Sequence, residues 1–220
     1  MKVILFGATG MVGQGVLREC LLDPGVEHVL TIGRSVTGQQ HAKLSEIEQK
    51  DLANLSPIEG QLSGYDACFF CLGVSSVGMK EEDYRRITYD LTIAVANTLV
   101  RLNPAMTFVY VSGTGTDSTE KGRSMWARVK GKTENDLLKL PFKAAYMFRP
   151  GYIQPLHGIR TKTALYGAFY VVIKPFYPVL KLLLSNYVTT TECIGRAMLT
   201  VARQGAPKRW LENADINGLC

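Results

Sequence analysis

Three glycines near the start of the chain have the spacing of a phosphate-binding turn. Gly7, Gly10 and Gly13 follow a short apolar run, residues 1–6, and precede an amphipathic stretch. Gly7 allows a tight turn, Gly10 lets a pyrophosphate approach the backbone, and Gly13 lets a helix pack closely on the strand. Phosphates would then bind the free N–H groups and the positive end of that helix. The alternative is a glycine turn without a ligand, but the order strand, turn, helix favours a dinucleotide site. Other residues of this turn predicted to bind the cofactor are Thr9, Met11 and Val12.

The end of the second predicted strand indicates which dinucleotide binds. An acidic residue about 20 positions after the glycines would accept hydrogen bonds from the ribose of NAD. The chain has Arg34 and Ser35 there instead. A guanidinium matches a phosphate in charge and in the geometry of its donors, so we predict NADP in preference to NAD. The alternative is that Arg34 stacks on the adenine or points to solvent.

Further candidate cofactor residues follow the later predicted strands. Ligands of open α/β sheets bind at the carboxyl ends of the strands. Asp51 follows a weak strand and would meet the adenine, unless this segment is a plain loop. Gly73 would let the backbone approach the cofactor. The predicted cofactor contacts of this group are Asp51, Leu52, Cys71, Leu72, Gly73, Pro150 and Gly151.

Strands and helices alternate in the segments that would position these residues. Apolar residues recur at helical spacing in 11–22, 80–102 and 123–140. The predicted strands are 1–6, 26–32, 42–47, 65–72, 107–111 and 144–148, and the tail carries a short strand at 209–211. This alternation predicts an α/β protein with a doubly wound parallel sheet, the Rossmann fold. We predict a single domain, residues 1–220, in which 151–188 form a small helical lobe for the substrate or a partner.

Residues 164–184 form the most unusual stretch because they are almost continuously apolar. Lys174, Pro175 and Pro178 interrupt the stretch, which argues against one membrane-spanning helix. Two short helices fit better. Three roles stay open for them: a substrate-binding lobe, the surface of a homodimer, or contact with a membrane surface.

Composition narrows the class of protein. The chain has 220 residues and a net charge of +6. Its densest basic stretch, residues 121–132, contains acidic residues and lacks a nucleic-acid-binding motif, so we predict a solvated helix face and no nucleic-acid partner. The five cysteines are odd in number and scattered, which argues against a disulfide framework and for a reducing, cytoplasmic location. Cys68 and Cys71 lie on an apolar strand without a second pair, so we predict small buried side chains and no metal site.

Residues that match the pattern of a known superfamily are spread over most of the chain. They are the 7–13 turn, 71–73, Ser112, Lys130 and 149–151. With them the chain resembles the atypical branch of the short-chain dehydrogenase/reductase superfamily, near the Tat-interacting-protein-like, NmrA-like and NAD-dependent epimerase/dehydratase-like proteins. In that superfamily a serine binds the substrate carbonyl, a tyrosine transfers the proton, and a lysine four residues later holds the nicotinamide ribose. The resemblance implies that Ser112 and Lys130 are catalytic and that Lys130 also contacts the cofactor.

The tyrosine of this pattern is missing. Its position holds Trp126, whose indole N–H is a donor only and cannot serve as the proton acid. Tyr152 is the best substitute by sequence order, although it also fits a packed structural tyrosine. Asp90 could replace the family's helix asparagine. Two functions stay open: an NADP-dependent oxidoreductase acting on an apolar carbonyl substrate, or a non-catalytic dinucleotide-binding, redox-sensing regulator.

Overall fold

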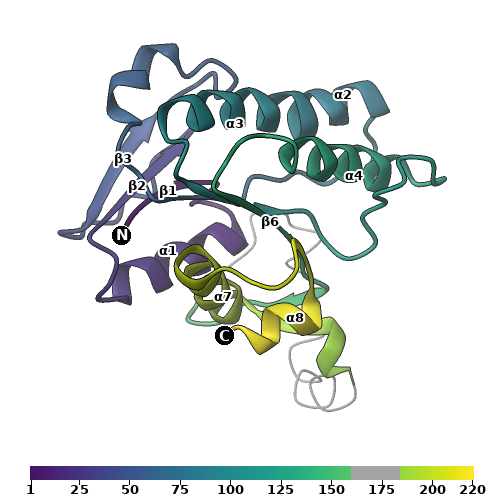
Figure 1. The fold of residues 1–220 in the computed structure, drawn as a ribbon. Coiled ribbons are helices and arrows are strands. Elements are labelled where there is room, and N and C mark those ends of the chain that lie inside the picture. Colours follow the sequence, from purple (N-terminus) through teal and green to yellow (C-terminus); the bar gives the residue numbers. More distant parts are fainter. Residues whose placement is uncertain (160–183) are drawn as a thin grey trace.

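The computed structural model describes residues 1–159 and 184–220. Its centre is a seven-stranded sheet in the order β3-β2-β1-β4-β5-β6-β9 (Figure 1). All paired neighbours in it are parallel. The chain winds outward from β1 in one direction, then returns to β4 and winds in the other, which confirms the predicted doubly wound Rossmann fold. The strands are β1 (Lys2–Phe6), β2 (His28–Gly33), β3 (Leu44–Glu48), β4 (Ala67–Phe70), β5 (Thr107–Val111), β6 (Ala144–Arg149) and β9 (Trp210–Glu212).

Helices cover both faces of this sheet (Figure 1). One face carries α1 (Met11–Leu22), α7 (Thr191–Gln204) and α8 (Asn213–Gly218), and the other carries α2 (Glu81–Arg85), α3 (Leu91–Leu102) and α4 (Met125–Leu137). A 3-10 helix, η1 (Ser56–Gln61), precedes β4. The helix predicted over 80–102 is interrupted, because a π-helical turn, η2 (Arg86–Asp90), separates α2 from α3. Helix α8 is absent from the sequence prediction.

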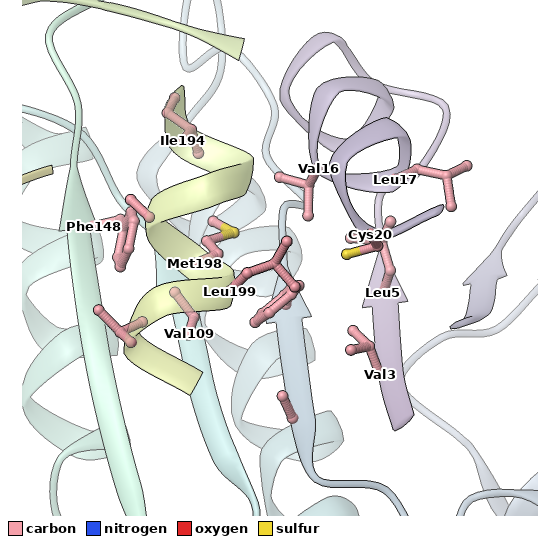
Figure 2. Close-up of a cluster of buried hydrophobic side chains, with 14 of the residues drawn as sticks. Val3, Leu5, Val16, Leu17, Cys20, Val109, Phe148, Ile194, Met198 and Leu199 are labelled. Atoms are coloured by element: carbon pink, nitrogen blue, oxygen red, sulfur yellow. The ribbon is translucent and has the colours of Figure 1, made fainter. Parts of the chain in front are cut away.

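The six strands β1 to β6 contribute to two separate hydrophobic cores, and β9 contributes Leu211 to one of them. In β1, Val3 and Leu5 pack beneath α1 and α7, whereas Ile4 and Phe6 pack on the opposite face. This alternation follows from the two-residue repeat of a strand, and burial on both faces explains why the strands are apolar throughout. Figure 2 shows the first core, in which Val16, Leu17 and Cys20 of α1 and Ile194, Met198 and Leu199 of α7 lie over Val3, Leu5, Val109 and Phe148.

A second, two-stranded parallel sheet pairs β7 (Tyr152–Gln154) with β8 (Val188–Thr190). Another 3-10 helix, η4 (Ser185–Tyr187), leads into β8. The strands were not predicted, because three residues are too few to show a repeat. The lobe predicted at 151–188 and the three roles of 164–184 stay predictions, since residues 160–183 lie outside the described part. Among the described helices, none combines the length and hydrophobicity needed to cross a membrane.

The cysteines correct one prediction and confirm another. Cys193 and Cys220 form a disulfide, although the number and scatter of the cysteines argued against a disulfide framework. Helix α8 turns the chain back onto α7 and so brings the two residues together. Cys20, Cys68 and Cys71 are free. Cys68 and Cys71 pack toward opposite cores, as predicted, but only Cys68 is fully buried. Among the described residues, no three potential metal ligands lie together.

Candidate functional site

A cavity of about 620 Å³ opens where β1, β2 and β4 end. It lies on both sides of the point at which the strand order reverses, where open α/β sheets bind ligands. Predicted cofactor residues that line it are Gly7, Thr9, Gly10, Met11, Arg34, Ser35, Leu52, Cys71, Leu72 and Gly73. Lining residues that the sequence analysis did not name are Ala8, Thr31, Ile32, Gly33 and Lys50.

The glycine turn is shaped by close backbone contacts. Gly7 has a φ of +81°, and a Cβ there would lie 2.7 Å from the carbonyl carbon of Cys71. A Cβ at Gly13 would overlap the carbonyl oxygen of Gly7, so Gly13 serves packing rather than the cavity wall. Val12 also lies outside the wall and packs against the core beneath α1.

The first turn of α1 is open to an anion. Gly10 is its N-cap and supplies no side-chain cap, and no acidic residue lies in this turn. The N–H of Gly10 donates to the carbonyl oxygen of Gly7 at 2.9 Å, which closes the turn. The first N–H groups of the helix therefore keep their donors and the positive end of its dipole for a ligand.

Two cations stand together at the far end of the cavity. Arg34 follows β2 and Lys50 follows β3, and the N–H of Gln49 donates to the carbonyl oxygen of Gly33 at 2.9 Å, which keeps the two segments side by side. None of the described lining residues is acidic. Lys50 forms an ion pair with Glu48 outside the wall. Lys50 lies next to Asp51, the residue predicted to meet the adenine. The place of Lys50 just beyond the end of a strand was the signal that could have identified it.

Asp51, Pro150 and Gly151 do not reach the cavity wall. The Asp51 carboxylate accepts a hydrogen bond from the N–H of Ala53 at 3.0 Å and so stabilises its own loop. The carbonyl oxygen of Pro150 accepts from the N–H of Thr114 at 2.9 Å. These residues shape the loops around the site.

The predicted catalytic pair, Ser112 and Lys130, is brought together beyond β5. The hydroxyl of Ser112 is 4% exposed and donates to the Glu134 carboxylate at 2.5 Å. The ammonium of Lys130 donates to the backbone carbonyl oxygen of Ser112. Burial lowers the pKa of Lys130 to about 8, although the Glu134 carboxylate acts in the opposite direction. Neither residue lines the 620 Å³ cavity.

Glu134 and Arg149 hold this region through a buried ion pair. Glu134 is fully buried, and Arg149 donates to it through Nε at 3.0 Å and also through Nη2. Arg149 further contacts Glu212 at 3.1 Å and the hydroxyl of Ser118 at 2.5 Å. The Ser112 hydroxyl is thus fixed toward the protein interior. The sequence analysis missed Glu134, although its place four residues after Lys130 puts both on one helix face.

Thr114 supplies the exposed hydroxyl of this region. Its Oγ1 donates to the carbonyl oxygen of Arg149 at 3.0 Å. It lies two residues after Ser112, and this spacing within 112–116 was the signal that could have identified it. A ligand at the end of β5 therefore meets Thr114 before Ser112.

Trp126 is the second residue of α4 and lies one helical turn before Lys130. Its six-membered ring lies against Gly115, where an added Cβ would be 3.4 Å from Cη2. The hydroxyl of Tyr152 donates to the side-chain oxygen of Gln154 at 2.9 Å, as a packed structural tyrosine would.

Within η2, Asp90 is exposed and lies 3.7 Å from Arg85. Thr88 is the buried polar residue of this turn, and its Oγ1 has no hydrogen-bond partner among the described residues. Thr88, rather than Asp90, therefore presents a polar group to the interior.

Solved structures share this fold. The enzyme WbmF of Bordetella bronchiseptica, in complex with NAD+, has a TM-score of 0.68 and 15% identity, covering 99% of this chain and 76% of its own. The UDP-glucose 4-epimerase of Thermotoga maritima, in complex with UDP-glucose, has a TM-score of 0.64 and 13% identity, covering 92% of this chain and 74% of its own. Part of each neighbour thus lacks a counterpart here.

Curated relatives are similar in sequence over most of the chain. Protein FMP52-2, mitochondrial, of Scheffersomyces stipitis is 29% identical over 152 residues, which cover 68% of this chain and 65% of that protein. Protein FMP52, mitochondrial, of Candida albicans is 24% identical over 172 residues, covering 74% of each. These names contradict the cytoplasmic location predicted from the cysteines, a prediction that the disulfide had already weakened.

The model of the NAD dependent epimerase/dehydratase family matches residues 3–125 of the 220. This match begins in β1 and contains the glycine turn, Arg34, Lys50 and Ser112. The chain therefore belongs to the NAD dependent epimerase/dehydratase family.

Proposed function

We propose that this protein binds NADP(H) in the 620 Å³ cavity and reduces an apolar carbonyl substrate. The observation that carries the proposal is the cavity wall, which combines the glycine turn with Arg34 and Lys50 and has no acidic residue among its described members. Two cations suit a 2′-phosphate, whereas a carboxylate would suit a free ribose hydroxyl. Hydrogen bonds to charged groups contribute about 1.5–3 kcal/mol each, so we expect NADPH to bind at least about tenfold more tightly than NADH.

Calorimetric titration with NADPH, NADP+, NADH and NAD+ tests the cofactor. The double variant Arg34→Ala/Lys50→Ala should lose the preference for the phosphorylated forms and retain NADH binding. Lys121→Ala is the matched control, because Lys121 is exposed and lies outside the cavity. Equal affinity of the wild type for NADPH and NADH would refute the role of the two cations.

The bound dinucleotide supplies the hydride, and the chain binds and orients the reactants. Lys130 would hold the nicotinamide ribose, as the family resemblance implies. Thr114 would turn its exposed hydroxyl away from the carbonyl oxygen of Arg149 and donate to the substrate carbonyl, while Ser112 joins β5 to α4 through Glu134. Trp126 would offer an aromatic face to an apolar substrate.

A non-catalytic NADP(H)-sensing role is the second candidate. The engaged hydroxyl of Ser112 and the indole at residue 126 favour it, since neither supplies a proton to a substrate. NADPH oxidation with a panel of aldehydes, ketones, quinones and sugar nucleotides separates the candidates. Turnover by the wild type would eliminate the sensing role. Turnover only by Trp126→Tyr would show that the proton acid has been lost, and would eliminate the reductase.

A further inference from the structure

Helix α8 connects segments that lie far apart in the sequence. Its Asn213 accepts a hydrogen bond from the N–H of Gly151 at 2.9 Å, just before β7. Its Asn217 donates to the carbonyl oxygens of Ser185 and Val188 at 3.0 and 2.9 Å, at the start of β8. The Cys193–Cys220 disulfide then joins the residues after α8 to α7. One covalent bond therefore secures the helix that holds both strands of the small sheet.

The two sulfur atoms of this disulfide differ in access. Cys193 is 8% exposed and packs in the core beneath α7. Cys220 is exposed and lines a cavity of about 390 Å³ between α1 and α7. An attacking thiol can reach Cys220 far more easily than Cys193.

The cavity beside Cys220 has a balanced set of charges. Arg203 pairs with Asp23 at 2.6 Å, and Arg196 pairs with Glu19 at 3.1 Å. All four side chains line the cavity, together with Leu22, Leu199 and Thr200. Alternating charges of both signs suit a small zwitterion better than a strongly charged anion or cation.

Access distinguishes the two sulfur atoms, whereas leaving ability does not. Cys193 lies in the first turn of α7, and its N–H donates to the N-cap hydroxyl of Thr190 at 3.0 Å. The positive end of the helix favours a thiolate there, but burial in the core and the oxygen atoms of Ile216 and Asn217, at 3.8 and 3.5 Å from Sγ, disfavour it. These influences oppose each other, so the greater exposure of Cys220 is what directs attack to it.

We propose that Cys220 is a thiol-exchange site for a small zwitterionic thiol. The thiolate attacks Sγ of Cys220 and forms a mixed disulfide. The bond to Cys193 breaks, its electron pair leaves with the Cys193 sulfur, and that sulfur takes a proton from water. The reaction consumes one thiol and needs no separate oxidant. It releases α8 from α7, and with it the hold on Gly151 and β8.

Reduced glutathione is the probe. Oxidised full-length protein is incubated with it, quenched with acid, alkylated and mapped by peptide mass spectrometry. We expect the adduct on Cys220 and an alkylated thiol on Cys193, in about tenfold excess over the reverse arrangement. Amide hydrogen exchange at Gly151 and in 188–190 should accelerate in the adduct, while exchange in β4 and β5 stays unchanged.

Single variants separate access from chemistry. In Cys193→Ser, the remaining Cys220 thiol should alkylate rapidly, and in Cys220→Ser the remaining Cys193 thiol should alkylate slowly. The proposal fails if the protein has five free thiols before glutathione is added, because the disulfide would then be absent. It also fails if the adduct forms on Cys193, or if exchange occurs only on unfolding. Unchanged hydrogen exchange at Gly151 would refute the proposed hold on β7 and β8.

Discussion

The region that we propose binds the dinucleotide, called the dinucleotide end, and the region around Ser112 that we propose carries the reaction, called the chemistry end, are built differently. The dinucleotide end, around the 7–13 turn, is an open cavity shaped by backbone contacts and lined by the cations Arg34 and Lys50. The chemistry end, around Ser112, is a closed set of side chains in which hydroxyl, carboxylate and guanidinium satisfy one another. The first end is open to solvent, whereas the second is built around a buried charge. We therefore expect substitutions to alter the two ends separately.

The largest loss of stability should come from a substitution at Glu134, in the chemistry end. Glu134→Gln removes the fully buried charge that pairs with Arg149 and leaves the partly buried guanidinium with only the more exposed carboxylate of Glu212. Loss of one partner of a buried pair costs about 3–5 kcal/mol. Urea unfolding should show this loss in the free energy of unfolding, while NADPH affinity changes less than about twofold. A parallel collapse of NADPH affinity would show that the two ends are coupled.

In the dinucleotide end, a substitution at Gly13 should weaken NADPH binding most. Gly13→Ala places a Cβ on the carbonyl oxygen of Gly7 and forces the turn open. Overpacking of this kind costs about 1–3 kcal/mol, and NADPH binding should fall at least about tenfold. Gly60→Ala is the matched control, since its Cβ would meet nothing within 4 Å. If Gly13→Ala bound NADPH as tightly as the wild type, the turn would not be part of the cofactor site.

The pH dependence of stability should distinguish the chemistry end, which contains the buried Lys130, from the dinucleotide end. Burial lowers the pKa of Lys130 to about 8 from its ordinary value of 10.5, so the unfolded chain binds more protons between these values. The Lys130 contribution to the free energy of unfolding therefore rises with pH across this window, by about 1–3 kcal/mol. Lys130→Met should remove the rise. Identical profiles of the wild type and the variant between pH 8 and 10.5 would contradict it.

The smallest structural effect is expected at Thr114. Thr114→Val removes an exposed hydroxyl and should change stability by less than about 0.5 kcal/mol. If Thr114 holds the carbonyl, kcat/KM should still fall about tenfold, whereas KM for NADPH stays constant. An unchanged kcat/KM would remove Thr114 from the reaction.

Local signals in the sequence predicted the sheet and the dinucleotide turn. Glycine spacing reports backbone geometry directly, and strand 107–111 shows its full bounds as an apolar run. The remaining features depend on partners distant in sequence. The role of Glu134 depends on its contact with Arg149, and the place of Lys50 at the cavity depends on the pairing of β3 with β2. The disulfide of Cys193 depends on the short helix α8, which brings Cys220 to it. Single residues carry no sign of such partners until the chain is folded.

The packing of α7 on α1 also has a consequence for synthesis on the ribosome. β1 and α1 emerge first, yet α7 covers the same face from the opposite end of the sequence (Figure 2). Arg196 of α7 contacts Glu19 of α1 across 177 positions. Until α7 has emerged, Val3, Leu5 and Val16 lack the cover that α7 provides, so the nascent chain presents an apolar surface to chaperones until that point.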